Sequence, residues 1–432
     1  MKTSRSFRLL LFFLFLNFSL SAQETETSPV ESLSVAAPQS AYMSQERLEK
    51  IDGMIESAIA EGQIPGAVAL VSRNGKIVYH KAFGQADGSG KDLQEDAIFR
   101  IASQTKAITA TAVMMLWEEG KFRLDDPISK YIPEFANAQI LSEFNPKDSS
   151  YTSTPAKTPI TIRHLLTHTS GLGYGVIDGD DRMKKIYQKA GIVELFTTED
   201  INIGDNTRKL AALPLHHEPG ERFTYSLGLD VLGYFVELMS GQPFDEFLRQ
   251  RIFEPIGMED TWFYLPKNKT GRLVAIQQKK DGKWEDFPNT FYDPNYPAFT
   301  NGNFFSGGAG LSSTALDYAK FLQMYLNGGN YNGNLILSPT TIETMMKNQV
   351  GDLWQDENKY YGLAFGVVTE TGVAKGGEGS KGSFDWGGYF NTQYFADPEE
   401  QVIGIILKQT QGNTGDQTAW KFRQMVMAAV AE

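Results

Sequence analysis

Ser103 and Lys106 have the spacing of a nucleophile and a base on one helix. The Ser-Gln-Thr-Lys segment 103–106 follows a strand-like run, 97–102, and opens a helical pattern that stops at Gly120. Side chains three positions apart share a helix face, so the lysine amine can reach the serine oxygen. A serine hydroxyl is a weak nucleophile until a base takes its proton, and an uncharged lysine amine can do this. A capping serine followed by a solvated lysine would have the same spacing.

Two further segments carry residues that suit an active site. Tyr225 lies between a turn at 218–220 and a helical pattern, where its phenol can reach the edge of a site. A packed or capping tyrosine would look the same. Trp386, Gly387 and Gly388 precede a strand-like run, and glycine in such a place often marks the close approach of a ligand. An ordinary bulge is the alternative.

Taken together and in order, these motifs resemble those of the family VIII carboxylesterases, which belong with class C β-lactamases and D-alanyl-D-alanine carboxypeptidases. The matching segments are S-x-x-K at 103–106, HLLTHTSGL at 164–172, Y-S-L at 225–227, GGAGL at 307–311 and W-G-G at 386–388. The resemblance covers roughly residues 44–430. It implies an α/β (α+β) fold, in which helices flank an antiparallel sheet and a mostly helical domain is inserted.

The resemblance also implies a role for each matching residue. Ser103 would be the nucleophile, and Lys106 and Tyr225 would share the proton transfers. The backbone N–H groups of Ser103 and Tyr389 would form the oxyanion hole. The substrate-binding residues beside it would be Trp386, Gly387 and Gly388. Neither a cofactor nor a metal is implied.

Two departures from the β-lactamase and peptidase pattern favour a neutral ester as the substrate. Leu227 replaces the asparagine that binds an amide, and Trp386 replaces the lysine that pairs with a substrate carboxylate. Lys381 is close enough in sequence to replace part of that charge. We therefore expect a serine hydrolase that cleaves carboxylic esters. A D-Ala-D-Ala peptidase or β-lactamase on the same fold is one alternative, and a non-catalytic binding or sensor module is another.

The two ends of the chain predict one antiparallel sheet. Near the N-terminus, a helix at 44–62 precedes two strand-like runs joined by Asn74-Gly75, which is a strong hairpin signal. Near the C-terminus, two strand-like runs at 389–396 and 401–409 precede a final helix at 416–431. Residues 43–125 and 310–432 are accordingly predicted to form the α/β sheet domain, with a mostly helical inserted domain at 126–309.

Three other groups of residues could carry function, although packing explains them equally well. His164 and His168 are four apart on a predicted helix, but the glutamate of a zinc protease is absent between them, so packed or capping histidines are favoured. The pair His216-His217 is expected in a loop. An aromatic group could line an apolar pocket or fill the core: Phe287, Phe291, Tyr292, Tyr296, Phe299, Phe304 and Phe305.

The N-terminus predicts export. Residues 1–22 contain three basic residues, an apolar run too short to span a bilayer, and a small-residue site at Ala22, all typical of a cleaved secretory signal peptide. An uncleaved membrane anchor is the alternative. Residues 23–42 are predicted to be a linker. The expected location is therefore periplasmic or secreted.

Composition narrows the partners. The 432 residues include no cysteine, which excludes thiol nucleophiles and disulfides. The formal net charge of −12 makes nucleic acid an improbable partner. A small-molecule ester and no stable membrane insertion are expected, while the sequence leaves the oligomeric state open.

Overall fold

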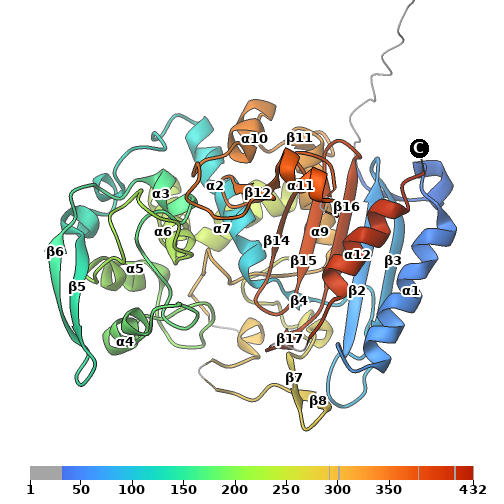
Figure 1. Cartoon of the computed structure of the whole chain (residues 1–432), viewed down its shortest axis with the longest axis horizontal. Coiled ribbons are helices and arrows are strands. Elements are labelled where there is room, and N and C mark those ends of the chain that lie inside the picture. The colour runs from blue at the N-terminus through green and yellow to red at the C-terminus, as the bar shows by residue number, and fades with distance from the viewer. Residues whose placement is uncertain (1–31, 291, 300–301, 378, 413–414, 432) are drawn as a thin grey trace, which may run out of the picture.

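An eight-stranded sheet forms the centre of the computed structural model, which describes residues 32–290, 292–299, 302–377, 379–412 and 415–431 (Figure 1). The predicted signal peptide lies outside the described residues. In spatial order the strands are β1 (Ser34–Val35), β3 (Lys76–Gly84), β2 (Gly66–Arg73), β16 (Val402–Leu407), β15 (Gln393–Asp397), β14 (Phe384–Gly387), β13 (Gly366–Val368) and β12 (Lys359–Tyr361). Only the β1–β3 pairing is parallel.

The prediction that both chain ends build one antiparallel sheet is confirmed. β2 pairs with β16, placing Leu70 opposite Ile405, and every residue of both strands is buried. The turn between β2 and β3 has Asn74 at φ 51° and Gly75 at φ 70°, the left-handed geometry that Asn-Gly favours in a tight hairpin. Burial on both faces explains why these strands are continuously apolar rather than alternating.

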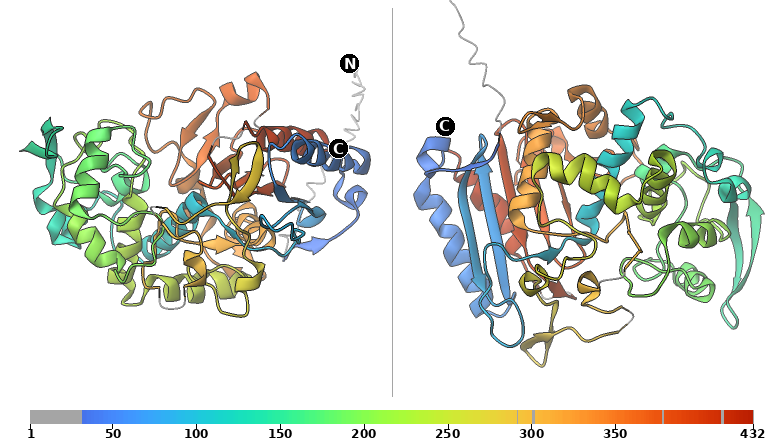
Figure 2. Two further views of the ribbon diagram at one scale, coloured as in Figure 1. Left: turned by 90° about the horizontal axis from the view of Figure 1, so that it is seen from below. Right: turned by 180° about the vertical axis from the view of Figure 1, so that it is seen from behind.

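Helices cover both faces of the sheet. On one face lie α1 (Gln45–Ala60), which Ser44 caps, and α12 (Thr418–Ala428), side by side (Figure 1). On the other face lie α2 (Thr105–Glu118) and α9 (Ala315–Leu326), as the view from behind shows (Figure 2). α2 is buried from Thr105 through Leu116, so it is a core helix rather than an amphipathic surface helix.

The helical part of the chain lies at the end of the molecule away from α1 and α12 (Figure 2). Its main helices are α3 (Ile162–Leu166), α4 (Asp181–Ala190), α5 (Ile203–Ala211), α6 (Gly228–Ser240) and α7 (Phe244–Leu248). A hairpin of β5 (Gln139–Asn145) and β6 (Ser150–Pro155) projects from it. A further small sheet is formed by β7 (Gln277–Lys280), β8 (Lys283–Asp286) and β17 (Thr410–Gln411). The exact domain boundaries stay a prediction.

Three local details differ from the expectations. The run before Ser103 contributes only β4 (Phe99–Arg100), which pairs with β9 (Ser312–Ser313). The strand predicted at 389–396 begins at Gln393, because 388–392 turn back on themselves through a Gly388 N–H bond to Thr392 O. Within the predicted linker, residues 34–41 form β1 and a 3-10 turn. No helix among the described residues is long and apolar enough to cross a membrane.

Candidate active site

Ser103 lies in a 3-10 turn, Ala102–Gln104, directly before α2. Ala102 is fully buried and has φ 43°, a left-handed conformation that non-glycine residues rarely adopt. Such backbone strain persists only where the surrounding structure enforces it, and it is frequent at functional sites. The sequence placed Ser103 correctly at the strand-to-helix junction, but the left-handed turn was not foreseen.

Lys106 is fully buried beneath Ser103. Its Nζ lies 3.3 Å from Ser103 Oγ and donates to Gly308 O at 2.8 Å and to Tyr174 OH at 3.0 Å. The same nitrogen lies 4.6 Å from the ring centre of Tyr225. All of these partners are uncharged, and within the described part of the chain Lys106 forms no ion pair.

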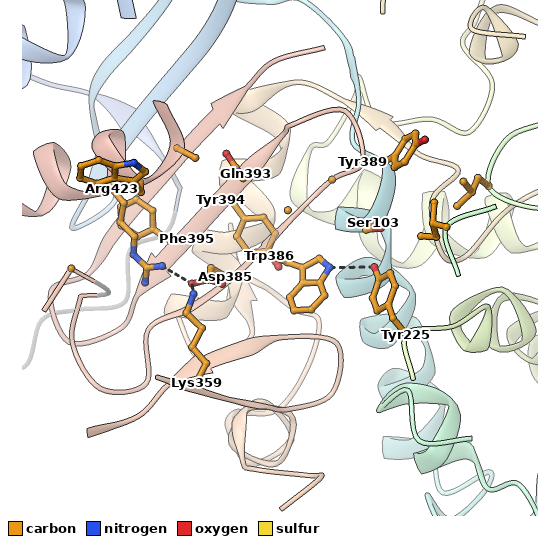
Figure 3. Close-up of a pocket in the computed structure, with 17 residues that line it drawn as sticks. Ser103, Tyr225, Lys359, Asp385, Trp386, Tyr389, Gln393, Tyr394, Phe395 and Arg423 are labelled. Carbon is orange, nitrogen blue, oxygen red and sulfur yellow. Dashed lines mark hydrogen bonds and ion pairs between the residues drawn. The ribbon is translucent and has the colours of Figure 1, made fainter. Parts of the chain in front are cut away.

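Tyr225 comes from the segment before α6, in the helical part of the chain. Its hydroxyl points toward Ser103 (Figure 3) and accepts a hydrogen bond from Trp386 Nε1 at 3.4 Å. Its ring packs against His168 and Tyr174, with centroids 4.5 and 5.6 Å away. The structure thus brings together Ser103, Lys106 and Tyr225, as the sequence predicted.

A cavity of about 570 Å³ opens over these residues (Figure 3). Every predicted site residue except the buried Lys106 lines it: Ser103, Tyr225, Trp386, Gly387, Gly388 and Tyr389. A Cβ atom at Gly388 would collide with Thr392 Oγ1 and with the carbonyl of Ile101, so this position requires glycine. In the described part of the chain, no backbone hydrogen bond uses the Tyr389 N–H.

Tyr174 is a site residue that the sequence analysis missed. Burial, together with the neighbouring Tyr225 and Asp230, raises its pKa well above the ordinary value, so the phenol keeps its proton. It lies two residues beyond the HTSGL segment that carries the resemblance, which is the signal that could have found it.

Asp230 and Gly308 complete the surroundings of Lys106. Asp230, on the first turn of α6, is buried, and its Oδ1 accepts from Ser306 Oγ at 2.5 Å and from Gly308 N at 3.3 Å. Burial raises the pKa of this carboxyl, and its hydrogen bonds and Lys106 oppose the shift. Asp230 therefore holds the backbone whose carbonyl accepts from Lys106.

The histidines have structural partners. His168 is fully buried, accepts the Ser226 N–H at 3.1 Å, and has its pKa lowered well below normal by burial and by Lys106. His164 caps the N-terminus of α3 through Thr161. His216 Nε2 lies 2.9 Å from Asp178 Oδ2. The described residues contain no group of three or more His, Asp or Glu side chains placed to hold a metal ion.

Two other expectations are resolved by the structure. Lys381 is an exposed side chain that pairs with Glu370 at 2.5 Å and does not line the cavity, so it does not replace the missing cation. Of the aromatic group, Tyr292, Tyr296 and Phe304 are buried, and none of its described members lines the cavity of Ser103. Core packing is therefore the role of these three, Phe299 is exposed, and Phe291 lies outside the described residues.

A serine and a lysine at the start of a buried helix, beside a glycine pair at the end of the inner strand β14, are the arrangement of a β-lactamase type of site. The chain belongs to the beta-lactamase family, whose family model matches residues 51–426. It is 33% identical to protein Rv1367c of Mycobacterium tuberculosis over 362 residues, 81% of this chain and 86% of that protein. It is 30% identical to esterase EstB of Burkholderia gladioli over 391 residues, 85% of this chain and 92% of the esterase.

Among solved structures, the chain is similar to EstCE1, described as a hydrolase with promiscuous acyltransferase activity. The TM-score is 0.75 with 27% identity, covering 90% of this chain and 99% of EstCE1. The predicted family and fold class are thereby confirmed.

Proposed function

We propose that this protein is a serine carboxylesterase that cleaves carboxylic esters through an acyl-enzyme on Ser103. The observation that carries the proposal is the buried Lys106 amine, 3.3 Å from Ser103 Oγ, beneath a cavity that Tyr225 also lines. The similarity to esterase EstB and to EstCE1 supports ester hydrolysis as the reaction.

In the first half-reaction, Lys106 takes the Ser103 proton while Oγ attacks the ester carbonyl carbon. The carbonyl oxygen becomes an oxyanion, which the N–H groups of Ser103 and Tyr389 stabilise. The tetrahedral intermediate collapses, the bond to the alcohol oxygen breaks, and the leaving alkoxide receives a proton through Tyr225. In the second half-reaction, water gives up a proton along the same path, attacks the acyl carbon and releases Ser103 and the acid.

A fluorophosphonate probe tests the nucleophile. We expect the probe to add to Ser103, identified by peptide mass spectrometry, and to fail on Ser103→Ala. That variant should lose at least about a thousandfold in kcat/KM yet stay folded, since the Ser103 side chain caps neither the 3-10 turn nor α2. Esterase activity retained by a folded Ser103→Ala protein would overturn the proposed function.

Trp386 supports the choice of a neutral ester over a carboxylate-bearing substrate. Its indole contacts the rings of Tyr225, Trp354 and Tyr361, with centroids 5.3–6.1 Å away, at the position where the β-lactamase and peptidase pattern has a lysine. A substrate carboxylate packed on this indole would lose its hydration, and the two cations of the cavity wall, Lys359 and Arg423, already pair with Asp385. We expect kcat/KM for p-nitrophenyl acetate or butyrate to exceed that for penicillins and D-Ala-D-Ala peptides by orders of magnitude, after correction for spontaneous hydrolysis.

Trp386→Lys tests whether charge is the cause. This variant should narrow the gap between the ester and the carboxylate substrates. Faster cleavage of D-Ala-D-Ala peptides than of simple esters by the unaltered protein would contradict the neutral-ester assignment.

We also infer that the protein is exported and begins at or near Gln23 after cleavage. Intact-mass analysis of protein recovered from the periplasm or medium checks this inference. An exported form that still begins at Met1 would contradict it.

A further inference from the structure

The catalytic cavity has a second end, away from Ser103. From Tyr225 the wall follows Trp386 and Asp385 along β14 and reaches Phe395 and Arg423, on the side of α12 (Figure 3). The first turn of α12 contributes Ala419 and Trp420 to this end. A volume of about 570 Å³ for the whole cavity lies in the range that holds drug-sized ligands. A short-chain ester on Ser103 would leave this end empty.

Trp420 differs from the tryptophans near Tyr225 in its exposure and in its lack of ring partners within the described chain. Trp354 and Trp386 lie in the aromatic cluster around Tyr225 and Tyr361. Trp420 is 58% exposed, and among the described residues it has no hydrogen-bond or ring partner. A single exposed aromatic residue is ordinary on a protein surface. An exposed indole in the wall of the nucleophile's own cavity is instead a surface on which a ligand can pack.

The backbone that carries Trp420 is held firmly. Lys408 donates to Asp416 and, at 2.8 Å, to Thr418 Oγ1, which fixes the start of α12. One turn beyond Trp420, Arg423 pairs with Asp385 on β14. A platform that is positioned before binding does not have to be ordered by the ligand, so its contacts contribute fully to affinity.

The position of Tyr225 indicates which half of an ester faces Trp420. The leaving alcohol oxygen must lie next to the group that protonates it, which is Tyr225 in the proposed function. Trp386 donates a hydrogen bond to Tyr225 and belongs to the part of the cavity wall that runs from Tyr225 to α12. An alcohol leaving beside Tyr225 therefore extends along Trp386 toward Trp420. The acyl half faces the other end of the cavity, on the side of Tyr389 (Figure 3).

We propose that Trp420 is a specificity-determining residue, and that the preferred substrates are esters whose alcohol half carries an uncharged ring system that packs on its indole. This proposal rests on the proposed function, because the direction of the alcohol follows from the role of Tyr225.

Three esters separate the two halves of the substrate. Vinyl acetate is small on both sides, 2-naphthyl acetate carries its ring on the alcohol, and vinyl benzoate carries its ring on the acyl group. Each variant is compared with the unaltered protein on the same ester, so the intrinsic reactivity of the ester cancels. Trp420→Ala should lose about tenfold in kcat/KM on 2-naphthyl acetate, the size of one aromatic contact. Vinyl acetate and vinyl benzoate should change by less than about twofold on this reasoning.

Two further variants make the result specific. Trp420→Phe keeps a ring and should restore most of the loss. Tyr42→Ala removes an aromatic side chain of similar exposure, 56%, that does not line the cavity, and should leave all three esters unaffected.

An equal loss on all three esters, or no loss on 2-naphthyl acetate, would overturn the role of Trp420. A selective loss on vinyl benzoate would reverse the assigned direction and overturn the proposal in this form. These outcomes leave the proposed function standing as long as Ser103→Ala is inactive, so the two failures can be told apart.

Discussion

Two lysines of this protein are buried to the same degree but have opposite surroundings. Lys106 is 0% exposed and Lys408 is 1% exposed. Lys408 donates to the Asp416 carboxylate and to Thr418. Burial lowers the pKa of Lys408, and Asp416 opposes that shift. Among the described residues, the hydrogen-bond partners of Lys106 are a serine hydroxyl, a phenol and a carbonyl.

The difference separates a structural lysine from one suited to chemistry. A carboxylate partner fixes the proton on the amine and uses the charge to join two segments, here the end of β16 and the start of α12. Neutral partners hold the Lys106 amine in place, and one of them is the hydroxyl that loses its proton in the proposed mechanism. Removing each lysine should therefore damage a different property of the protein.

The largest expected effect is on catalysis. Lys106→Met should lower kcat/KM for p-nitrophenyl acetate by about 10⁴-fold, because residues that act as one unit are lost together. The unfolding midpoint in urea should change less than in Lys408→Met, because Lys106 has no ion-pair partner among the described residues and the nearby buried Asp230 keeps its hydrogen bonds from Ser306 and Gly308. A folded Lys106→Met protein that keeps more than about a tenth of the original activity would contradict the catalytic role of Lys106.

The second effect is on stability. Lys408→Met leaves Asp416 buried without its cation, which should lower the free energy of unfolding by about 3–5 kcal/mol. Activity on vinyl acetate per folded molecule should persist, because Lys408 does not line the catalytic cavity. Adding Asp416→Asn to Lys408→Met should recover part of the stability, which urea unfolding at constant pH will measure. A stable Lys408→Met protein would contradict the structural role.

Glu194 extends the comparison of the two buried lysines to a buried acid. It has no cationic partner among the described residues. Its oxygens accept the Gly175 and Val176 N–H groups, the latter at 2.7 Å, and burial raises its pKa to about 7. The folded protein then keeps a proton that the unfolded chain releases near pH 4.5. The Glu194 contribution to stability is therefore full below that pH and is lost as the pH rises toward 7.

Glu194→Gln should remove this pH dependence. Between pH 4.5 and 7, the unfolding free energy of the unaltered protein should fall relative to the variant by roughly 3 kcal/mol. Parallel urea titrations at several pH values check this, and a constant difference between the two proteins would contradict it.

The smallest effect concerns the phenol beside Lys106. Tyr174→Phe removes one hydrogen-bond partner of Nζ and should lower kcat/KM by about tenfold, the size of one buried hydrogen bond. Tyr187→Phe is the matched control, because its buried hydroxyl accepts from Gly173 at 3.2 Å and does not touch Lys106. Equal losses in the two variants would show that Tyr174 acts through packing alone.

Local patterns explain what could be predicted about the site. The Ser103–Lys106 contact follows from helical spacing, and the Asn74-Gly75 hairpin follows from turn chemistry. The strand predicted at 389–396 is too long, because residues 388–392 form a turn in which Asn391 has φ 64°, and β15 begins only at Gln393. Asparagine tolerates this left-handed conformation, so Asn391 is the residue that marks the turn in the sequence.

The sequence by itself determined the contact between Ser103 and Lys106, the family and the sheet built from both chain ends, because each depends on spacing or order along the chain. Only the tertiary structure decided what surrounds Lys106, since Tyr174 and Gly308 reach it across 68 and 202 positions of sequence. The tertiary structure also decided that Lys381 pairs with Glu370 outside the cavity, although Lys381 is close to Trp386 in the chain. Proximity in sequence sets no side-chain direction, and the packing of distant elements decides whether a buried charge meets a carboxylate or a neutral acceptor.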